Sequence, residues 1–449
     1  MTARRAVMRL AVVLLVVLAA VVLRYPEPSP PAMRTVALEG WPSAVAVDTR
    51  TARAFIASSD VVHHTGRVSV LDTATGTIVR TVVVPAFPTA VAMGAVPRHA
   101  ATGARVFVAG YSANGQGCVY MLDARSGRIL RTVVVYRDPS GAVPTAVVGL
   151  VVDDRTDRAF VAGYLPGSGF RGIVSMLDAT SGRLLRTVRI GTHPAALVVD
   201  RRAGRVFVAS AGGVGVLDAR RGVLLRTLAL SAPPAAMAVD ERRRRIFIGT
   251  TGPPPGMGLP SGTAHVSVLD ASGGTVITTV PLSASASALA VDEVSGHALV
   301  GTMGGVDSQG HGMAGRVRVL DGRRGAVVRT LVVGQSPVVM AVDGRHGRIV
   351  VGTRDTTGET PSHTGRLLVL DARSGRILHT LLRNAAPVAL AVDERAGRAV
   401  VVSYGGTVGR PDAWRWVPSW LRARLSFLVP PPPRTSAVPS SVSILDLTR

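Results

Sequence analysis

Lysine is missing from the sequence altogether: all 51 basic residues are arginine, against 28 acidic residues, and asparagine occurs only twice. A bias that runs through the whole chain indicates compositional pressure. We therefore assign the formal charge of +23 to composition and structural pairing before any dedicated polyanion site. The one cysteine, Cys118, excludes a disulfide framework, a CxxC zinc pair and a haem-attachment motif.

Motifs of the common enzyme classes are also missing. The sequence contains no GxSxG elbow, no Walker loop and no GxGxxG fingerprint after a strand. Aromatic residues make up only 4% of the chain, and single-strand nucleic-acid sites need aromatic platforms in a basic groove. Tyr111 and Tyr164, with Arg171, are the only interleaved candidates, so nucleic acid is a disfavoured partner.

Hydrophobic residues are plentiful, at 47% of the chain, and 49 glycines and 29 prolines accompany them. This composition is typical of many short strands joined by tight turns. It also excludes wholesale disorder.

The amino-terminal segment differs from the rest of the chain. Arg4, Arg5 and Arg9 precede an uncharged run over residues 10–23, and a proline-rich spacer follows over 24–33. A basic start before an apolar run predicts export by a signal peptide over 1–23, or by a membrane anchor if cleavage does not occur. The basic end then stays cytoplasmic, and residues 34–449 lie on the periplasmic or extracellular side, tethered by 10–23 in the anchored case.

Eight Leu-Asp pairs divide the chain, and a glycine follows each of the first seven aspartates by four residues. These aspartate and glycine pairs are Asp72 and Gly76, Asp123 and Gly127, Asp178 and Gly182, Asp218 and Gly222, Asp270 and Gly274, Asp321 and Gly325, and Asp371 and Gly375. The pattern predicts hairpins in which aspartate accepts backbone hydrogen bonds and glycine takes a positive φ.

A second signature, P-x-A-x-A-V-D followed by R-x-F-V-A, precedes each Leu-Asp pair. Its aspartate and arginine, such as Asp240 and Arg245, flank a short turn and are expected to pair across it. Each unit then holds four strands, which predicts an all-β propeller of four-stranded antiparallel blades. Counting units gives eight blades, with seven as the alternative. Residues 34–38 supply a fourth strand, and 442–446 supply a third, so the two ends are expected to close the ring in one blade.

These repeats resemble the YVTN repeat of surface-layer-like and YncE-like β-propellers. The segments FIAS, VFVAG, AFVAG, VFVAS and IFIGT match its name-giving slot, and the V-x-V-L-D-x-x-x-G turn follows. The resemblance covers residues 34–449 and implies the propeller fold. It implies little about function, because such propellers include surface proteins and ligand binders.

Long, variable loops lie between the second and third strands of the units, and variable loops on a rigid scaffold are the default binding surface. Several carry histidine or carboxylate side chains that suit a divalent metal or a small ligand. The candidates are Asp60, His63, His64, Asp307, His311, Asp355 and His363. No cofactor is otherwise expected, and no short-range ligand spacing supports the metal.

An unusual insertion occupies residues 404–441 in the last unit. It carries Trp414, Trp416 and Trp420, followed by Leu421, Leu425 and Leu428 at helix-like spacing, with Phe427 alongside. Such a stretch suits an interfacial helix on a membrane surface. The alternative is a plug that packs over the channel mouth.

Together these observations predict an exported, monomeric, non-catalytic propeller that binds a protein, a cell-envelope component or a small ligand through its long-loop face. The alternative is a metal- or small-ligand-dependent enzyme with its site at the channel mouth. Binding of a polyanion or single-stranded DNA ranks third.

Overall fold

A computed structural model describes residues 31–60, 63–94, 103–112, 114–137, 146–165, 169–252, 264–306, 312–334, 336–354, 365–383, 386–409 and 435–448. These ranges contain strands, turns and coil, and within them no helix is long and apolar enough to cross a membrane. The expected signal or anchor segment, 1–23, lies outside the described residues.

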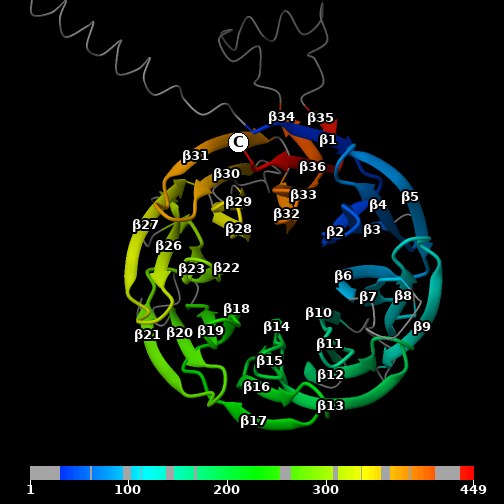
Figure 1. The fold of residues 1–449 in the computed structure, drawn as a ribbon, viewed down its shortest axis with the longest axis horizontal. Helices are drawn as coiled ribbons and strands as arrows, with labels where there is room; N and C mark the ends of the chain where they lie inside the picture. The colour runs from blue at the N-terminus through cyan, green and yellow to red at the C-terminus, as the bar shows by residue number, and fades with distance from the viewer. Residues whose placement is uncertain are drawn as a thin grey trace, which may run out of the picture.

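Eight four-stranded antiparallel sheets stand around a central channel, as Figure 1 shows, which confirms eight blades and excludes seven. The innermost strands are β2 (Trp41–Asp48), β6 (Phe87–Gly94), β10 (Ala146–Asp153), β14 (Ala196–Asp200), β18 (Pro234–Asp240), β22 (Ala286–Asp292), β28 (Ser336–Asp343) and β32 (Ala386–Asp393). The second strands are β3 (Arg53–Asp60), β7 (Arg105–Tyr111), β11 (Arg158–Leu165), β15 (Arg205–Ser210), β19 (Arg245–Thr250), β23 (His297–Thr302), β29 (Arg348–Arg354) and β33 (Arg398–Tyr404). We number the blades 1 to 8 in this order.

The third and fourth strands complete each blade toward the rim. The third strands are β4 (Thr65–Asp72), β8 (Gly117–Asp123), β12 (Arg171–Asp178), β16 (Gly213–Asp218), β20 (His265–Asp270), β26 (Gly315–Asp321), β30 (Gly365–Asp371) and β36 (Ser441–Asp446). The outermost strands are β5 (Thr77–Val84), β9 (Ile129–Tyr136), β13 (Leu184–Thr192), β17 (Leu224–Leu228), β21 (Val276–Pro281), β27 (Val327–Gly334), β31 (Ile377–Arg383) and β1 (Met33–Ala37).

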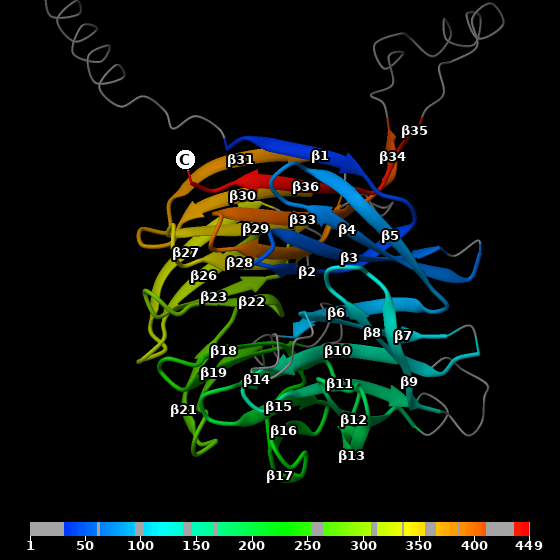
Figure 2. The ribbon, with the colours of Figure 1, turned by 45° about the vertical axis from the view of Figure 1, so that its right-hand side comes forward.

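The ring closes by pairing the two ends of the described chain. β1 pairs antiparallel with β36, with Met33 opposite Leu445 and Ala37 opposite Ser441. In Figure 2 β1 lies on β36 as the outer strand of blade 8. The closure expected from the sequence is thus confirmed, and it leaves blade 8 with the same four strands as the other blades.

Burial explains the residue pattern of each strand position. β3 is almost continuously buried, whereas β5 at the rim is mostly exposed. Second strands are apolar on both sides because a neighbouring blade covers each face of the sheet. The phenylalanine of the R-x-F motif is fully buried at Phe55, Phe107, Phe160, Phe207 and Phe247. Burial of each such ring stabilises the fold by roughly 1.5–3 kcal/mol.

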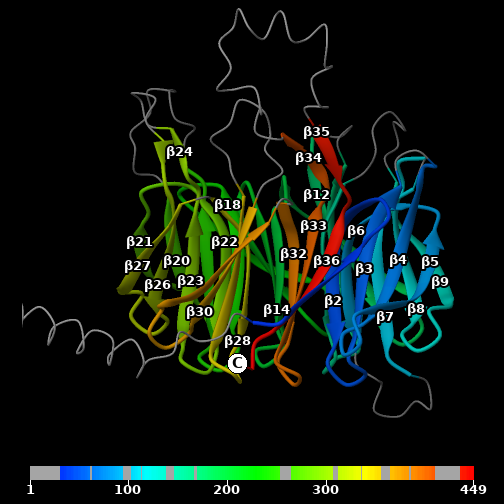
Figure 3. The same ribbon diagram turned by 90° about the horizontal axis from the view of Figure 1, so that it is seen from above.

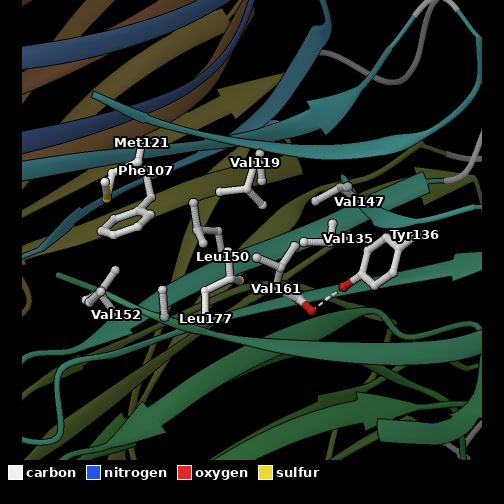
Figure 4. Close-up of a cluster of buried hydrophobic side chains, with 13 residues drawn as sticks. Phe107, Val119, Met121, Val135, Tyr136, Val147, Leu150, Val152, Val161 and Leu177 are labelled. Atoms are coloured by element: carbon white, nitrogen blue, oxygen red, sulfur yellow. Dashed lines mark hydrogen bonds between the residues drawn. The ribbon is translucent and has the colours of Figure 1, made fainter. Parts of the chain in front are cut away.

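The hydrophobic core lies between blades. Figure 4 shows one cluster in which Phe107 and Met121 of blade 2 pack with Leu150 and Val161 of blade 3. The Tyr136 hydroxyl of the rim strand of blade 2 donates to the carbonyl of Val161 across the same contact. Each blade therefore depends on its neighbours for its buried surface.

The ring has two different faces. Turns between first and second strands and between third and fourth strands form the short-turn face. Loops between second and third strands, with the links between blades, form the long-loop face. β1 starts at the short-turn face, where the backbone amide of Asp446 donates to Ala32 O at 3.0 Å. The antiparallel pair of β34 (Gly406–Gly409) and β35 (Thr435–Val438) projects from the long-loop face (Figure 3).

The repeated hairpin turn is visible at Asp270. Its Oδ1 accepts hydrogen bonds from the backbone amides of Gly273 at 2.6 Å and Ser272 at 2.9 Å. The Gly273 amide is the main reason that the pKa of Asp270 is lowered from its usual 3.8. Gly274 then adopts φ of 62°. The other turns with aspartate and glycine have the same design, as at Asp72, Asp123, Asp178, Asp218 and Asp371.

The expected pairing of aspartate and arginine across the first turn of each unit is wrong, as Arg245 shows. Arg245 lies opposite both Asp240 and Asp270 in the sheet, and it pairs with Asp270, at 2.9 Å, rather than across its turn with Asp240. The fully buried carboxylate of Asp240 instead accepts from the backbone amide of Arg243 at 2.8 Å inside the turn. The same cross-strand pairing recurs as Arg105–Asp123, Arg158–Asp178, Arg205–Asp218 and Arg348–Asp371.

Candidate functional site

Asp60, His63 and His64 are the described members of the metal set that the sequence suggests. Asp60 Oδ2 lies 2.8 Å from His63 Nδ1 and 2.9 Å from Arg67 Nη1. The hydrogen bonds from His63, aided by Arg67, lower the pKa of Asp60 to about 2. His64 packs edge-on against Phe87, with ring centroids 6.1 Å apart. The Asp60 carboxylate is thus already compensated by protein groups.

The other members, Asp307, His311, Asp355 and His363, lie outside the described residues. Within the ranges that are described, no group of three or more His, Cys, Asp or Glu side chains is arranged to hold a metal ion. A metal site therefore stays a prediction from the loop sequences.

Three groups of contacting aromatic rings lie on the long-loop face, at consecutive blades. Tyr404 of blade 8 contacts Trp41 of blade 1 at 5.7 Å, and Phe87 and Tyr111 of blade 2 stack at 5.2 Å. On blade 3, Tyr164 lies 5.8 Å from Phe170. We call this set the aromatic arc, and it consists of Tyr404, Trp41, His64, Phe87, Tyr111, Tyr164, Phe170 and His193.

Phe170 and His193 form the most tightly built part of the arc. Their rings stack at 4.5 Å with an interplanar angle of 23°. The backbone amide of His193 also donates to Phe170 O at 3.0 Å. His193 lies in the link from blade 3 to blade 4, so this contact joins a loop to the link between two blades.

Three residues of the arc have left-handed backbone conformations that side chains other than glycine rarely adopt. Their φ angles are 51° at His64, 58° at Phe170 and 48° at His193. The remaining positive-φ residues other than glycine within the described ranges are Ala52, Asp157 and Arg244, and all three occupy the short-turn position filled by Gly204 or Gly397 in other blades. The repeated turn therefore explains the positive φ of Ala52, Asp157 and Arg244, but not that of the three arc residues. Strain gathered at the aromatic arc is typical of a functional surface.

The arc also differs from the core aromatics in its exposure. Trp41 is 54% exposed and Phe170 is 41% exposed, whereas the phenylalanines of the R-x-F motif are fully buried. Partly exposed aromatic rings supply large contact area at low entropic cost, and they are enriched at protein interfaces. The arrangement can therefore bind a flat or convex partner by ring contacts.

Sequence reasoning singled out only part of the arc. The sequence identifies Tyr111 and Tyr164 as loop-base aromatics, but as candidates for base stacking, and His64 as a metal candidate. Trp41 and Phe87 carry an available signal: each is the residue before the proline that opens the innermost strand. Tyr404 ends its second strand as Tyr111 does. His193 has no repeat signal because it lies in an inter-blade link.

Arginines gather on the opposite, short-turn face. A hollow of about 510 Å³ there is lined by six arginines of blades 3 and 4, among them Arg202 and Arg221. Nucleic-acid sites for single strands combine stacking rings with a basic groove on one surface. Here the aromatic arc and the arginine hollow lie on opposite faces of the ring, which does not favour that kind of site.

The wall of the central channel beside blades 1, 6, 7 and 8 is mostly apolar. A space of about 340 Å³ there is lined by innermost-strand residues, such as Val45, Leu289 and Met340, and Ser43 supplies the only side-chain hydroxyl. No titratable side chain is part of this lining. The small apolar wall gives no support to an enzyme site inside that part of the channel.

The insertion at 404–441 begins on the long-loop face as the β34–β35 pair, in which Gly406 lies opposite Val438. The residues proposed for membrane contact or for a plug, Trp414, Trp416, Trp420, Leu421, Leu425 and Phe427, lie outside the described residues. The described stem shows only that this segment leaves the ring on the face that carries the aromatic arc.

Comparison with solved structures supports the propeller fold. Sqt1 from Saccharomyces cerevisiae matches with a TM-score of 0.57 at 10% identity, over 84% of this chain and 96% of that one. Dihydro-heme d1 dehydrogenase NirN matches at 0.55 and 17% identity, over 79% and 68%. BamB from Moraxella catarrhalis matches at 0.51 and 14% identity, over 82% and 95%.

These identities show a shared fold and no shared activity, since one propeller fold hosts many functions. No protein-family model matches the chain, and no curated protein matches it by sequence. The chain is therefore an eight-bladed β-propeller, and its resemblance to YVTN repeats remains a prediction from the repeat motifs.

Proposed function

We propose that this protein is an exported propeller scaffold that binds a protein partner of the cell envelope through the aromatic arc. The observation that carries the proposal is the exposed and backbone-strained pair of Phe170 and His193, stacked at 4.5 Å beside Tyr164. Aromatic anchors held rigidly at the centre of a patch are the usual source of binding energy in protein interfaces.

Export rests on the amino-terminal sequence, in which Arg4, Arg5 and Arg9 precede the apolar run over 10–23. Cell fractionation of the full-length protein and of a variant lacking residues 1–23 tests it. We expect the full-length protein in the periplasmic, membrane or surface fraction and the shortened one in the cytoplasm. An identical cytoplasmic distribution of the two would reject export.

Photo-cross-linking in living cells tests the partner. A benzoylphenylalanine replaces Phe170 or Trp41, and Val294 serves as the matched control because it is 60% exposed on the short-turn face. We expect one discrete adduct from the two arc positions and none from position 294. The proposal fails if the arc positions give no adduct, or if position 294 gives the same one.

A further inference from the structure

The hollow on the short-turn face is formed where blades 3 and 4 meet. It measures about 510 Å³, and its charged lining is Arg155, Arg201, Arg202, Arg205, Arg220, Arg221 and Asp218. We call it the arginine pocket. Six guanidinium groups thus share one depression with a single lining carboxylate.

Two of these arginines are held by fixed partners. Arg201 pairs with Asp154 at 3.1 Å and with Glu241 at 2.9 Å, which ties blade 4 to blades 3 and 5. Arg205 pairs with the lining carboxylate, Asp218, at 3.3 Å. The carboxylates of Asp154, Glu241 and Asp218 are therefore paired with Arg201 and Arg205, and these contacts fix the pocket walls.

The other four arginines lack such fixed partners, although the charge of Arg202 acts on Glu293 and partly offsets the rise in the pKa of that carboxyl. Arg155, Arg202, Arg220 and Arg221 are exposed, and their guanidinium groups make no ion pair or hydrogen bond with any residue that the structure describes. Like charges gathered in a hollow repel one another and raise the local positive potential. An anion that enters the hollow relieves this repulsion.

The turn that presents two of these groups is rigid. The backbone amides of Arg220 and Arg221 donate to Asp218 Oδ1 at 2.9 and 2.8 Å. Gly222 follows with φ of 63°. Because these hydrogen bonds use backbone amides, replacing the side chains of Arg220 and Arg221 would leave the turn intact.

We propose that the arginine pocket binds a phosphate-bearing anion. Guanidinium groups match phosphate oxygens in planar, two-bond contacts, and several of them together suit a group of more than one charge. The volume lies within the range of small-ligand pockets. The phosphate can belong to a soluble phosphate compound or to the headgroup of an anionic phospholipid.

The lipid source fits the direction of the chain. β1 starts beside Asp446 at the short-turn face, which is the face that carries the arginine pocket. If residues 10–23 remain in a membrane, the spacer of 24–33 spans at most about 35 Å. The pocket would then lie on the face nearest to the lipid headgroups.

Blade 6 offers a matched control. Arg323 and Arg324 occupy the same turn positions as Arg220 and Arg221, with both amides bonded to Asp321 Oδ1. The first turn of blade 6 carries Glu293 and Val294 where blade 4 carries Arg201 and Arg202. The same charge change can thus be made outside the arginine pocket.

The first experiment titrates full-length protein with inorganic pyrophosphate by calorimetry. Wild type is compared with Arg220→Gln/Arg221→Gln and with the control Arg323→Gln/Arg324→Gln. The second measures binding to phosphatidylglycerol vesicles against phosphatidylcholine vesicles. An apolar anchor inserts into both lipids, so the readout is the difference between them.

We expect the pocket variant to lose affinity by at least about tenfold in one arm, with the control variant unchanged. Loss of pyrophosphate binding identifies a soluble phosphate ligand, and loss of the phosphatidylglycerol preference alone identifies a lipid headgroup. The proposal is overturned if wild type shows neither form of binding, or if both variants lose it equally. Matching thermal unfolding of the variants shows that the folds are intact.

Discussion

Arg34 Nη1 donates a hydrogen bond to the carbonyl oxygen of Thr75 at 2.9 Å, from the closing strand of blade 8 to a turn of blade 1. The contact is one of a series in which the rim-strand arginine of one blade reaches the third-to-fourth-strand turn of the next. The others are Arg80 to Ser126, Arg131 to Ser181 and Arg329 to Ser374. Each such arginine joins two blades at the rim, outside the apolar core.

Removal of the closing strand, β1, should lower the free energy of unfolding far more than substitution of its Arg34 alone. Removal of residues 1–38 leaves β36 as an open edge and abolishes the five-residue pairing between Met33 and Ala37. Since each lost hydrogen bond costs roughly 1 kcal/mol, we expect several kcal/mol of destabilisation and self-association through β36. Arg34→Ala should cost about 1 kcal/mol.

Thermal unfolding and light scattering measure both effects. A variant that lacks only residues 1–30 is the control, because it retains β1. Equal unfolding temperatures for the two shortened proteins, with both monomeric, would show that β1 does not close the ring.

The cost of replacing a turn glycine by alanine should depend on which atoms of the neighbouring blade lie close to it. Gly127 and Gly204 have similar φ angles, 67° and 63°. A Cβ at Gly127 would meet Arg80 Cδ at 3.0 Å and Val82 Cγ2 at 3.1 Å, whereas a Cβ at Gly204 would meet nothing within 4 Å. Alanine at either position bears the left-handed strain of about 1–2 kcal/mol, and alanine at 127 must also displace the rim of blade 1.

We therefore expect Gly127→Ala to lower the free energy of unfolding by more than Gly204→Ala does. Urea unfolding with unchanged slope provides the comparison. If the two substitutions have the same cost, Arg80 and Val82 move aside without penalty and do not restrict the side chain at position 127.

Glu293 should give a pH-dependent effect. Burial, with the nearby charges of Asp240 and Glu241, raises the pKa of Glu293 above 4.5. The folded state thus holds this proton more tightly than the unfolded state. The resulting stabilisation is complete below the unfolded-state pKa and is lost as the pH rises through the folded-state value. Near neutral pH the ionised carboxylate is a cost.

Glu293→Gln should therefore raise the unfolding temperature at pH 7, by an amount that corresponds to up to about 1 kcal/mol. The gain should shrink as the pH falls. Gln keeps an oxygen for the hydrogen bond that Glu293 accepts from the backbone amide of Glu241, at 2.9 Å. Glu241→Gln is the opposite case, because it removes the pair with Arg201 and should destabilise. A gain at position 293 that does not change with pH would contradict the assignment.

The repeated motifs predict the propeller architecture, whereas the ring contacts of the aromatic arc are seen only in the structure. Leu-Asp pairs recur in every blade, so blade number and closure followed from the sequence. The ion-pair partner of Arg245 could not be predicted from the sequence. Asp240 and Asp270 both lie opposite Arg245, and only the turn hydrogen bonds decide between them. The stack of Phe170 on His193 joins a loop to a link 23 residues later, and neither residue belongs to a repeated motif. Contacts between non-repeated segments leave no periodic signal.

At position 170 a glycine variant should be more stable than an alanine variant, the reverse of the usual order. Its φ of 58° is left-handed, and Gly169 before it has φ of 76°. Phe170→Gly loses the stacked ring but relieves the strained backbone, whereas Phe170→Ala loses the ring and keeps the strain. We expect the glycine variant to be more stable than the alanine variant by about 1 kcal/mol in urea unfolding.

Both variants should lose partner binding, because the ring itself makes the contact in the proposed interface. Phe170→Tyr is the control, since it keeps both the ring and the strain, and it should bind as wild type does. Such a site trades stability for activity, as strained functional positions do. If alanine proves the more stable of the two, position 170 is not held in its left-handed conformation by the fold, and the strain argument for the arc fails.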